Sequence, residues 1–331
     1  MSTTEPASAG HLDLKEAERA HRRELTGFCY RMLGSSSEAE DAVQETMLRA
    51  WRASERFEGR SSVRTWLFRI AHNTCVDMVR SPQRRALPVE LGPSSPTAEV
   101  VLGAPRPPET WVEPVLDSTV LEAGDPAELA AGRESIRLAF VAALQHLPAR
   151  QRAALILCDV LRWPAAEAAS LLDTSVASIN SSLQRARATL SSRREDGFDD
   201  TTLDDPASEP SRLLLERYVD AFQRYDMEAL VALMRDDIVL SMPPFDVWLQ
   251  GPDELVAWFV GQGAGCAGSR LLPLEIAGTS GFASYKPARP GRWEPFAIQV
   301  IELRDGRLSG HHNFLYPEWF ARLGLPDHLG D

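Results

Sequence analysis

Apolar residues in the first quarter of the chain recur every three to four positions, which is the spacing of helices with one buried face. Gly34–Ser37 interrupts the pattern, and Ser37 ahead of Glu38 and Glu40 predicts the N-cap of a new helix. We expect helices from about Leu12 to this break, from there to about Ala53, and from about Val63 to Arg80. The buried stripe of the second helix is expected to be Ala39, Ala42, Val43, Met47 (or Ala50) and Trp51.

A second block of helical periodicity covers residues 126–194. Within it, Ala165–Leu172, a turn at Asp173–Thr174 and a helix Ser175–Leu190 have the spacing of a helix-turn-helix. Ser175 suits an N-cap, and aspartate at 173 tolerates a left-handed turn. The last helix is expected to face the core with Val176, Ile179, Leu183, Ala186 and Leu190.

From Arg212 the pattern changes to helices followed by strands. The first stretch is amphipathic and helical, and the later apolar runs are short and separated by glycine or proline. Strands are expected at 237–242, 271–277, 282–285, 296–304 and 308–315, with a helix at 252–260. Opening helices followed by a meander of strands predict an α+β domain.

The chain is therefore expected to be multidomain, with two all-α units before an α+β domain. Its 331 residues fit two or three domains. Residues 87–131 contain eight prolines and residues 195–211 are acidic, so both are expected to be extended linkers, and residues 1–11 to be disordered. The predicted segments are 12–86, 87–131, 132–194, 195–211 and 212–331.

The net charge of −12 is unevenly distributed. Lys and Arg outnumber Asp and Glu by 14 to 12 in residues 1–86 and by 9 to 4 in residues 132–194. The acidic residues are in excess in residues 87–131, by 8 to 1, and in residues 195–331, by 23 to 11. Because salt screens charges beyond about 8 Å, the local charge decides nucleic-acid binding, and both helical units remain candidates for it.

The spacing of the cysteines and the composition of the N-terminus further restrict the class of protein. Cys29, Cys75, Cys158 and Cys266 are far apart in sequence and form no CxxC pair, so we expect reduced structural thiols and no metal or other cofactor. The N-terminus has neither a basic region nor an apolar core, and no run of 18 apolar residues occurs. These features predict a cytoplasmic protein without a membrane span.

The stretch EDAVQETMLRAWRASERFEGRSSVRTWLFRIAHNTCVDMVRS, followed by the helix-turn-helix LPARQRAALILCDVLRWPAAEAASLLDTSVASINSSLQRARATL, resembles the extracytoplasmic-function sigma factors, which have sigma regions 2 and 4 only. The resemblance implies binding to core RNA polymerase, through the β′ clamp and the β flap, and to promoter DNA. It also implies that Leu144–Val160 is the helix that precedes the helix-turn-helix motif. In such proteins the helix matching 38–52 docks on the clamp, which makes Asp41, Gln44, Glu45 and Arg49 the candidate polymerase contacts.

The loop and helix around Phe57–Arg80 are expected to read and open the −10 element. Arginines neutralise phosphates, and a melting protein must trap an unstacked base. By resemblance the loop Gly59–Val63 forms the base pocket and Asn73 reads a base edge, whereas Trp66 is expected mainly in the core. The candidate −10 residues are Arg60, Ser61, Ser62, Arg64, Arg69, Asn73 and Arg80.

The last helix of the helix-turn-helix is expected to read the −35 element with its outward positions. The candidates are Ser175, Ser178, Asn180, Ser181, Gln184, Arg185 and Arg187. Two departures from the family pattern stand out. Asp173 replaces the usual glycine, and Asn180–Ser182 lack the usual basic residue, which predicts fewer phosphate contacts and a different promoter preference.

Residues 212–331 resemble the SnoaL-like group of the NTF2-like fold, a cone-shaped sheet wrapped by helices around a pocket. The resemblance implies a domain that contacts the sigma regions and modulates their activity. One of His311 and His312 is expected to face outward, because strand side chains alternate. The candidate pocket residues are Asp246, Trp248, Trp258, His312 and Tyr316.

The interpretation that follows is a sigma factor that is not itself an enzyme, with an anti-sigma factor or a small-molecule ligand of the tail as further candidate partners. Two alternatives stay open at this point. One is a helix-turn-helix regulator that binds DNA without polymerase. The other is a SnoaL-like enzyme fused to a DNA-binding unit, with acid–base chemistry at Asp246 or His312.

Overall fold

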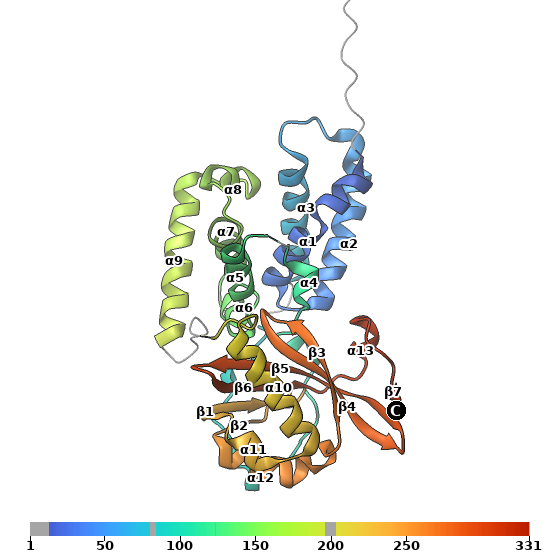
Figure 1. Ribbon diagram of the computed structural model, residues 1–331. Helices are drawn as coiled ribbons and strands as arrows, with labels where there is room; N and C mark the ends of the chain where they lie inside the picture. The colour runs from blue at the N-terminus through green and yellow to red at the C-terminus, as the bar shows by residue number, and fades with distance from the viewer. Residues whose placement is uncertain (1–12, 80–83, 123, 196–202, 331) are drawn as a thin grey trace, which may run out of the picture.

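The computed structural model describes residues 13–79, 84–122, 124–195 and 203–330, so the predictions for residues 1–11 and for Arg80 lie outside the described residues. Figure 1 shows two groups of helices side by side above a domain built on a β-sheet. We call these parts the N-terminal unit (13–79), the middle unit (124–195) and the C-terminal domain (203–330). Residues 84–122 are the linker.

The N-terminal unit consists of α1 (Leu14–Leu33), α2 (Ser36–Ala53), a 3-10 turn (Ser54–Arg56) and α3 (Val63–Met78). Gly34 ends α1 at a φ of 73°, and the Ser35 hydroxyl accepts a hydrogen bond from the Glu38 N–H. The N-cap of α2 is therefore Ser35, and the prediction of Ser37 is wrong. Ala39, Ala42 and Val43 are buried as expected, but Trp51 is 71% exposed and does not belong to the stripe.

The middle unit consists of α5 (Pro126–Glu134), α6 (Leu138–Gln145), α7 (Ala149–Leu155), α8 (Ala165–Leu171) and α9 (Val176–Glu195). The single helix expected at Leu144–Val160 is divided, because Pro148 cannot donate to the preceding turn and α7 starts after it. A π-helical turn follows at Ile156–Val160. The turn before α9 is confirmed: Asp173 has a φ of 51°, and the Ser175 hydroxyl accepts from the Ser178 N–H.

The C-terminal domain begins with α10 (Glu209–Arg224) and α11 (Met227–Val231), and α12 (Pro252–Val260) and a 3-10 turn (Gln262–Cys266) follow the second strand. Its strands are β1 (Met234–Ser241), β2 (Trp248–Gln250), β3 (Arg270–Ile276), β4 (Thr279–Arg289), β5 (Arg292–Arg304), β6 (Arg307–Phe314) and β7 (Leu329–Gly330), with α13 (Trp319–Arg322) before the last. The order is β2-β1-β6-β5-β4-β3, β7 pairs with β5, and only the β1–β6 pair is parallel.

The linker is packed against all three other parts of the molecule. It contains 3-10 turns at Pro88–Glu90, Thr97–Glu99 and Pro108–Thr110 and the one-turn helix α4 (Asp117–Val120). Trp111, Val112 and Val115 are almost completely buried, and the segment runs behind the sheet in Figure 1. Most of its backbone lies outside helices and strands, and the segment is part of the core.

Packing on both faces of the sheet explains why His311 and His312 are both buried. The face of the sheet that carries His311 is covered by α10 and α12, where Tyr218, Phe222 and Phe259 surround the imidazole. The face that carries His312 belongs to a second core, which the sheet shares with the linker and the helical units. The prediction that one histidine faces outward is therefore wrong, because neither face of this sheet is free at β6.

Candidate nucleic-acid interface

Helix α9 presents a continuous exposed face. Ile179, Leu183 and Ala186 anchor it on the middle unit, as the periodicity predicted, whereas Val176 is 43% exposed, contrary to expectation. All seven predicted −35 residues lie on the exposed side: Ser175, Ser178, Asn180, Ser181, Gln184, Arg185 and Arg187. Arg187 differs from the others because its guanidinium is engaged bidentately by Asp159, at 2.6 and 2.8 Å. Arg185 is thus the better placed of the two to reach a phosphate.

The predicted −10 residues fall into two groups. Arg60, which pairs with Glu58, lies in an exposed loop, and Asn73 is exposed on α3. Ser61 is half-buried, and Ser62 caps α3 by accepting from the Thr65 N–H. Arg64 and Arg69, by contrast, already have partners in the closed molecule.

The partners of Arg64 and Arg69 lie mostly in the middle unit. The Arg64 guanidinium pairs with Glu24 of α1 and stacks 4.1 Å from the ring of Trp163. Arg69 donates a 2.9 Å hydrogen bond to the carbonyl of Ser170, at the end of α8. Phe68 packs on the same Trp163 ring at 4.9 Å. Part of the predicted −10 surface is therefore in contact with α8 and with Trp163, the residue shortly before it.

A buried hydrogen-bond network also joins the middle unit to the C-terminal end of α1. Arg152 of α7 donates to the carbonyl of Met32 and to the side chain of Gln145, while Gln145 donates to the carbonyl of Arg31. In return, Arg31 donates to the Ser135 hydroxyl at 2.6 Å. The carbonyls at the end of a helix lack intrahelical partners, so the middle unit completes the C-terminus of α1.

The predicted polymerase face lies on the outer side of α2. Asp41 and Gln44 are exposed, and Glu45 and Asp77 both bind Arg49, at 2.8 Å. Two apolar residues of α2 are also exposed, Leu48 by 51% and Trp51 by 71%; of these, Trp51 was expected in the buried stripe. Exposed tryptophan beside a mixed-charge surface is typical of a protein-binding site.

The five predicted pocket residues of the C-terminal domain are not brought together around one cavity. Asp246 pairs with Arg106 of the linker at 2.5 Å, and Trp248 donates to the carbonyl of Gly92. Trp258 and Tyr316 belong to different cores. His312 contacts Ser241 at 2.8 Å and Glu302 at 3.6 Å. Residues of the linker therefore occupy the polar groups of Asp246 and Trp248 that we expected a ligand to contact.

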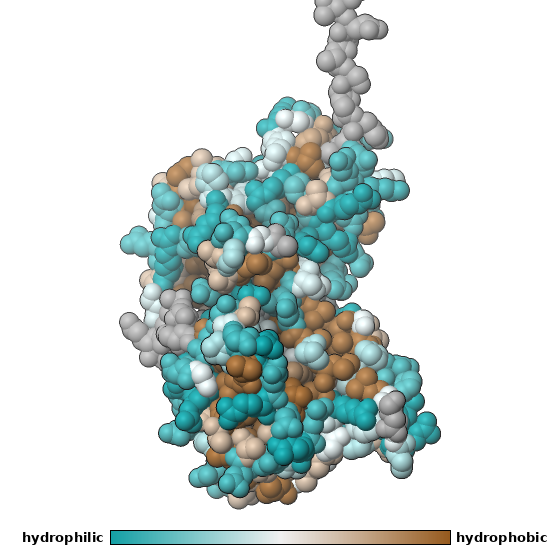
Figure 2. Space-filling model, in the orientation of Figure 1, coloured by the Kyte–Doolittle hydropathy of each residue, from teal (hydrophilic) through white to brown (hydrophobic). Residues whose placement is uncertain are grey.

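The C-terminal domain has an apolar hollow on its outer surface instead. It lies between α10 and strands β3 and β4, has a volume of about 720 Å³, and is lined by Leu215, Val219, Leu271, Leu274 and Phe282 among others. Figure 2 shows the apolar side chains that gather on this part of the domain.

The turn between β3 and β4 is a second contact of the sheet with the linker, besides the one that residues 92–106 make with Trp248, Asp246 and Glu254. The Ala277 N–H donates to the carbonyl of Val115, and the Gly278 N–H donates to the carboxylate of Asp117, at 2.8 and 2.9 Å. Arg322 of α13 lies 3.6 Å from Glu113, which also accepts from the Ser35 hydroxyl at 2.8 Å. The C-terminal domain therefore reaches, through Glu113, the N-terminus of the predicted polymerase-binding helix.

Neither a metal-binding cluster nor a membrane-spanning helix is found among the described residues. In that part of the chain no three His, Cys, Asp or Glu side chains gather as metal ligands would. Nor does any of its helices combine the length and the apolar character needed to cross a bilayer.

Three segments of the chain match family models. Residues 19–85 match sigma-70 region 2, residues 137–190 match sigma-70 region 4, and residues 215–311 match a SnoaL-like domain. The two helical units and the sheet domain correspond to these matches. These matches define the class of protein as a sigma factor with regions 2 and 4 and an additional α+β domain.

Relatives that match almost the whole chain identify the family within this class. The chain is 43% identical to the ECF RNA polymerase sigma factor SigG of Mycobacterium tuberculosis over 332 residues, which covers 99% of this chain and 88% of the relative. It is 27% identical to SigJ of the same organism over 334 residues, 96% of each protein. The crystal structure of SigJ matches with a TM-score of 0.58 at 25% identity, covering 95% of this chain and 100% of SigJ. The chain belongs to the extracytoplasmic-function RNA polymerase sigma factors.

Proposed function

We propose that this chain binds core RNA polymerase with α2 of the N-terminal unit and directs it to promoters. The −10 element is opened by the loop before α3 and read by α3, and the −35 element is read by α9. The middle unit also contacts the β flap. The observation that supports the proposal most is the exposure pattern: the outer faces of α2 and α9 are free, while Arg64 and Arg69 are held against the middle unit.

The closed arrangement must open for promoter binding. Elements named −10 and −35 lie more than 20 base pairs apart, which is roughly 70 Å of B-form DNA at about 3.4 Å per step. In the closed molecule α3 and α8 are in direct hydrogen-bond contact, at 2.9 Å. Polymerase and DNA therefore compete with the contact between the two units, and whatever strengthens that contact lowers initiation.

The C-terminal domain acts in this proposal as a non-enzymatic modulator. It binds the linker with the β3–β4 turn, and the candidate acid–base groups Asp246 and His312 are engaged by Arg106, Ser241 and Glu302. A side chain that is already paired and packed is poorly placed to exchange protons with a substrate. An anti-sigma factor and a small-molecule ligand remain the candidate signals that release the domain.

The proposal is tested by transcription with purified components. Full-length protein and sigma-free core polymerase, mixed on a library of genomic fragments, should give specific starts that need both components. DNA binding by the chain alone, with no starts in any mixture, would support a helix-turn-helix regulator that acts without polymerase. Turnover that is lost on Asp246→Asn or His312→Gln while transcription persists would support the enzyme.

Replacing Arg185 with alanine should lower transcription from a −35-dependent promoter several-fold and flatten its salt dependence, because one phosphate contact is removed. Arg185 is expected to make this contact because its side chain is exposed on the outer face of α9. The loss should disappear on a template whose −35 element is scrambled. An Arg185→Ala protein that transcribes like the unmodified one would show that α9 reads DNA with another face.

Acidification should tighten the contact between the C-terminal domain and the linker. Burial raises the pKa of Asp117 to about 6, although the Gly278 N–H and Arg133 oppose the effect. When the domain is released and Asp117 is exposed, its pKa returns towards about 3.9. The docked form then binds the proton more tightly, so the stability of docking is highest at low pH and falls as pH rises from about 4 through about 6.

The measurement is energy transfer between dyes on α13 and α2 of the full chain, recorded from pH 7.5 to pH 5. Asp117→Asn should keep the hydrogen bond to Gly278 and abolish the pH dependence of the signal. An identical titration in the two proteins would show that another group is responsible.

A further inference from the structure

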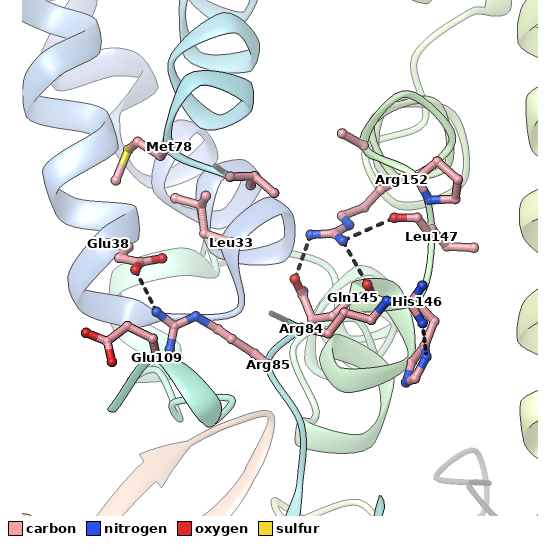
Figure 3. Close-up of a pocket in the computed structure, with 13 residues that line it drawn as sticks. Leu33, Glu38, Met78, Arg84, Arg85, Glu109, Gln145, His146, Leu147 and Arg152 are labelled. Carbon is pink, nitrogen blue, oxygen red and sulfur yellow. Dashed lines mark hydrogen bonds and ion pairs between the residues drawn. The ribbon is translucent and has the colours of Figure 1, made fainter. Parts of the chain in front are cut away.

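A cavity of about 490 Å³ lies where the N-terminal unit, the linker and the middle unit meet (Figure 3). Its walls come from the ends of α1 and α3, the start of α2, the linker and the α6–α7 connection. None of the surfaces assigned above to polymerase, to the promoter or to the C-terminal domain uses it. Its volume is in the range of small-molecule sites.

The cavity is unusually rich in arginine. Arg152 is only 5% exposed, both of its terminal nitrogens bind carbonyl or amide oxygens, and its Nε has no hydrogen-bond partner among the described residues. Arg84 is exposed at the cavity wall, and its Nη1 donates to His146 Nδ1 at 3.2 Å. Two like charges therefore face one small space.

Acidic residues offset this charge only in part. Glu38 lines the cavity, but it is paired with the third arginine, Arg85, at 2.6 Å. Glu109 is the other acidic lining residue, and it is exposed. A buried guanidinium that binds only neutral oxygens, beside a second arginine, is an environment that favours an anion.

We infer that this cavity binds a small phosphate-bearing molecule, which contacts the exposed guanidinium of Arg84 and is attracted by the buried charge of Arg152 in the cavity wall. Guanidinium groups match the geometry of phosphate oxygens better than any other side chain does. Leu33, Met78, Val79 and Leu147 form apolar walls beside the charged end, so a phosphate ester of nucleotide size fits better than inorganic phosphate.

Such a ligand would hold the molecule closed. Leu33 and Met78 of the wall belong to the N-terminal unit, whereas Arg152 belongs to the middle unit, so the site is complete only while the two units are in contact. A ligand that binds one state alone shifts the equilibrium towards it. This consequence rests on the proposed function: the cellular concentration of the ligand would set the fraction of the sigma factor that can open and bind polymerase.

The test is calorimetric titration of the full-length protein with adenosine monophosphate, inorganic phosphate and adenosine. Adenosine monophosphate should bind more tightly than phosphate, and adenosine should not bind. Glu109→Gln should tighten binding several-fold, because it removes a repulsive charge without disturbing a buried contact. Arg84→Glu should weaken binding about tenfold or more.

The matched control is Arg150→Glu, which reverses an exposed charge on α7, the helix of Arg152, but does not line the cavity. It should leave the affinity unchanged. Equal losses in the Arg84 and Arg150 variants, or no binding of either phosphate compound at millimolar concentration, would overturn the inference. So would a preference for single-stranded DNA that Arg84→Glu abolishes, since the arginines would then belong to a DNA path. The titration needs no polymerase, so its outcome is independent of the transcription test.

Discussion

Replacing Gly278 with alanine should pull the β3–β4 turn of the C-terminal domain away from Val115 and Asp117 of the linker, whereas the same change at Gly306 should leave that contact in place. The Cβ atom of an alanine at 278 would lie 2.1 Å from the carbonyl oxygen of Arg133, far inside van der Waals contact. The turn would have to withdraw, and the hydrogen bonds from Ala277 to Val115 and from Gly278 to Asp117 would be lost. We expect several-fold more transcription at limiting polymerase and less energy transfer between α13 and α2.

Gly306 is a close control because its turn has the same geometry. Ala277–Gly278 joins β3 to β4 with φ of 55° and 67°, and Asp305–Gly306 joins β5 to β6 with φ of 54° and 68°. Both variants therefore carry the same strain, about 1 kcal/mol, for alanine in the left-handed region. Nothing lies within 4 Å of the position that the Cβ atom of an alanine at 306 would occupy. Equal effects of the two substitutions would mean that turn strain, and not docking, controls activity.

A point substitution is a sharper test than deletion of the domain. Removing residues 212–331 should also change promoter-directed transcription several-fold. It would, however, expose the linker side chains Trp111, Val112 and Val115, which the larger core covers. Newly exposed apolar surface causes aggregation and local unfolding, which lower activity for reasons unrelated to release. Gly278→Ala displaces the turn alone and leaves the domain bound to the linker at Gly92 and Arg106.

The sequence predicts the local elements of this chain well, because each has a local cause. The helix-turn-helix follows from apolar spacing, and Asp173 and Ser175 have the conformations that their side chains favour. The outward face of α9 follows from the positions of Ile179, Leu183 and Ala186. The family resemblance then supplies the contacts with polymerase and DNA, which no pattern of spacing could give.

The errors concern contacts between distant segments. Trp51 fits an apolar stripe by spacing, but its side chain is left largely exposed on α2. His311 and His312 were expected on opposite sides of a half-exposed sheet, and the linker covers the side that would have been free. Proline and acidic residues indicated a tether, although the cluster of Trp111, Val112 and Val115 within it is a signal of burial that could have been read.

The same contacts explain why the predicted pocket is replaced by a different one. Asp246 and Trp248 were predicted to line a pocket, but Arg106 and Gly92 of the linker are their partners. The cavity beside Arg152 needs α1, the linker and α7 at once, so no single segment indicates it. Sites built from three segments depend on tertiary packing, which is the part of the structure least determined by local sequence.

Replacing Arg152 with methionine should open the molecule at the junction of the N-terminal and middle units. The guanidinium satisfies the carbonyls of Met32, Gln145 and Leu147, and it is almost completely buried. Methionine fills a similar volume but donates nothing, and breaking such a buried network costs roughly 3–5 kcal/mol. We expect a larger radius of gyration by small-angle scattering and faster proteolysis of the linker.

Arg150→Met separates this effect from a general loss of charge or stability. Arg150 lies two residues earlier on α7 and is exposed, so the same substitution removes the same charge without touching α1. It should leave both the scattering and the proteolysis unchanged. If Arg152→Met opens the molecule and raises transcription at low polymerase concentration, the contact between the two units is inhibitory. If it opens the molecule and transcription stays the same, polymerase binding supplies enough free energy to open it unaided, and the closed form would then be a resting conformation without regulatory effect.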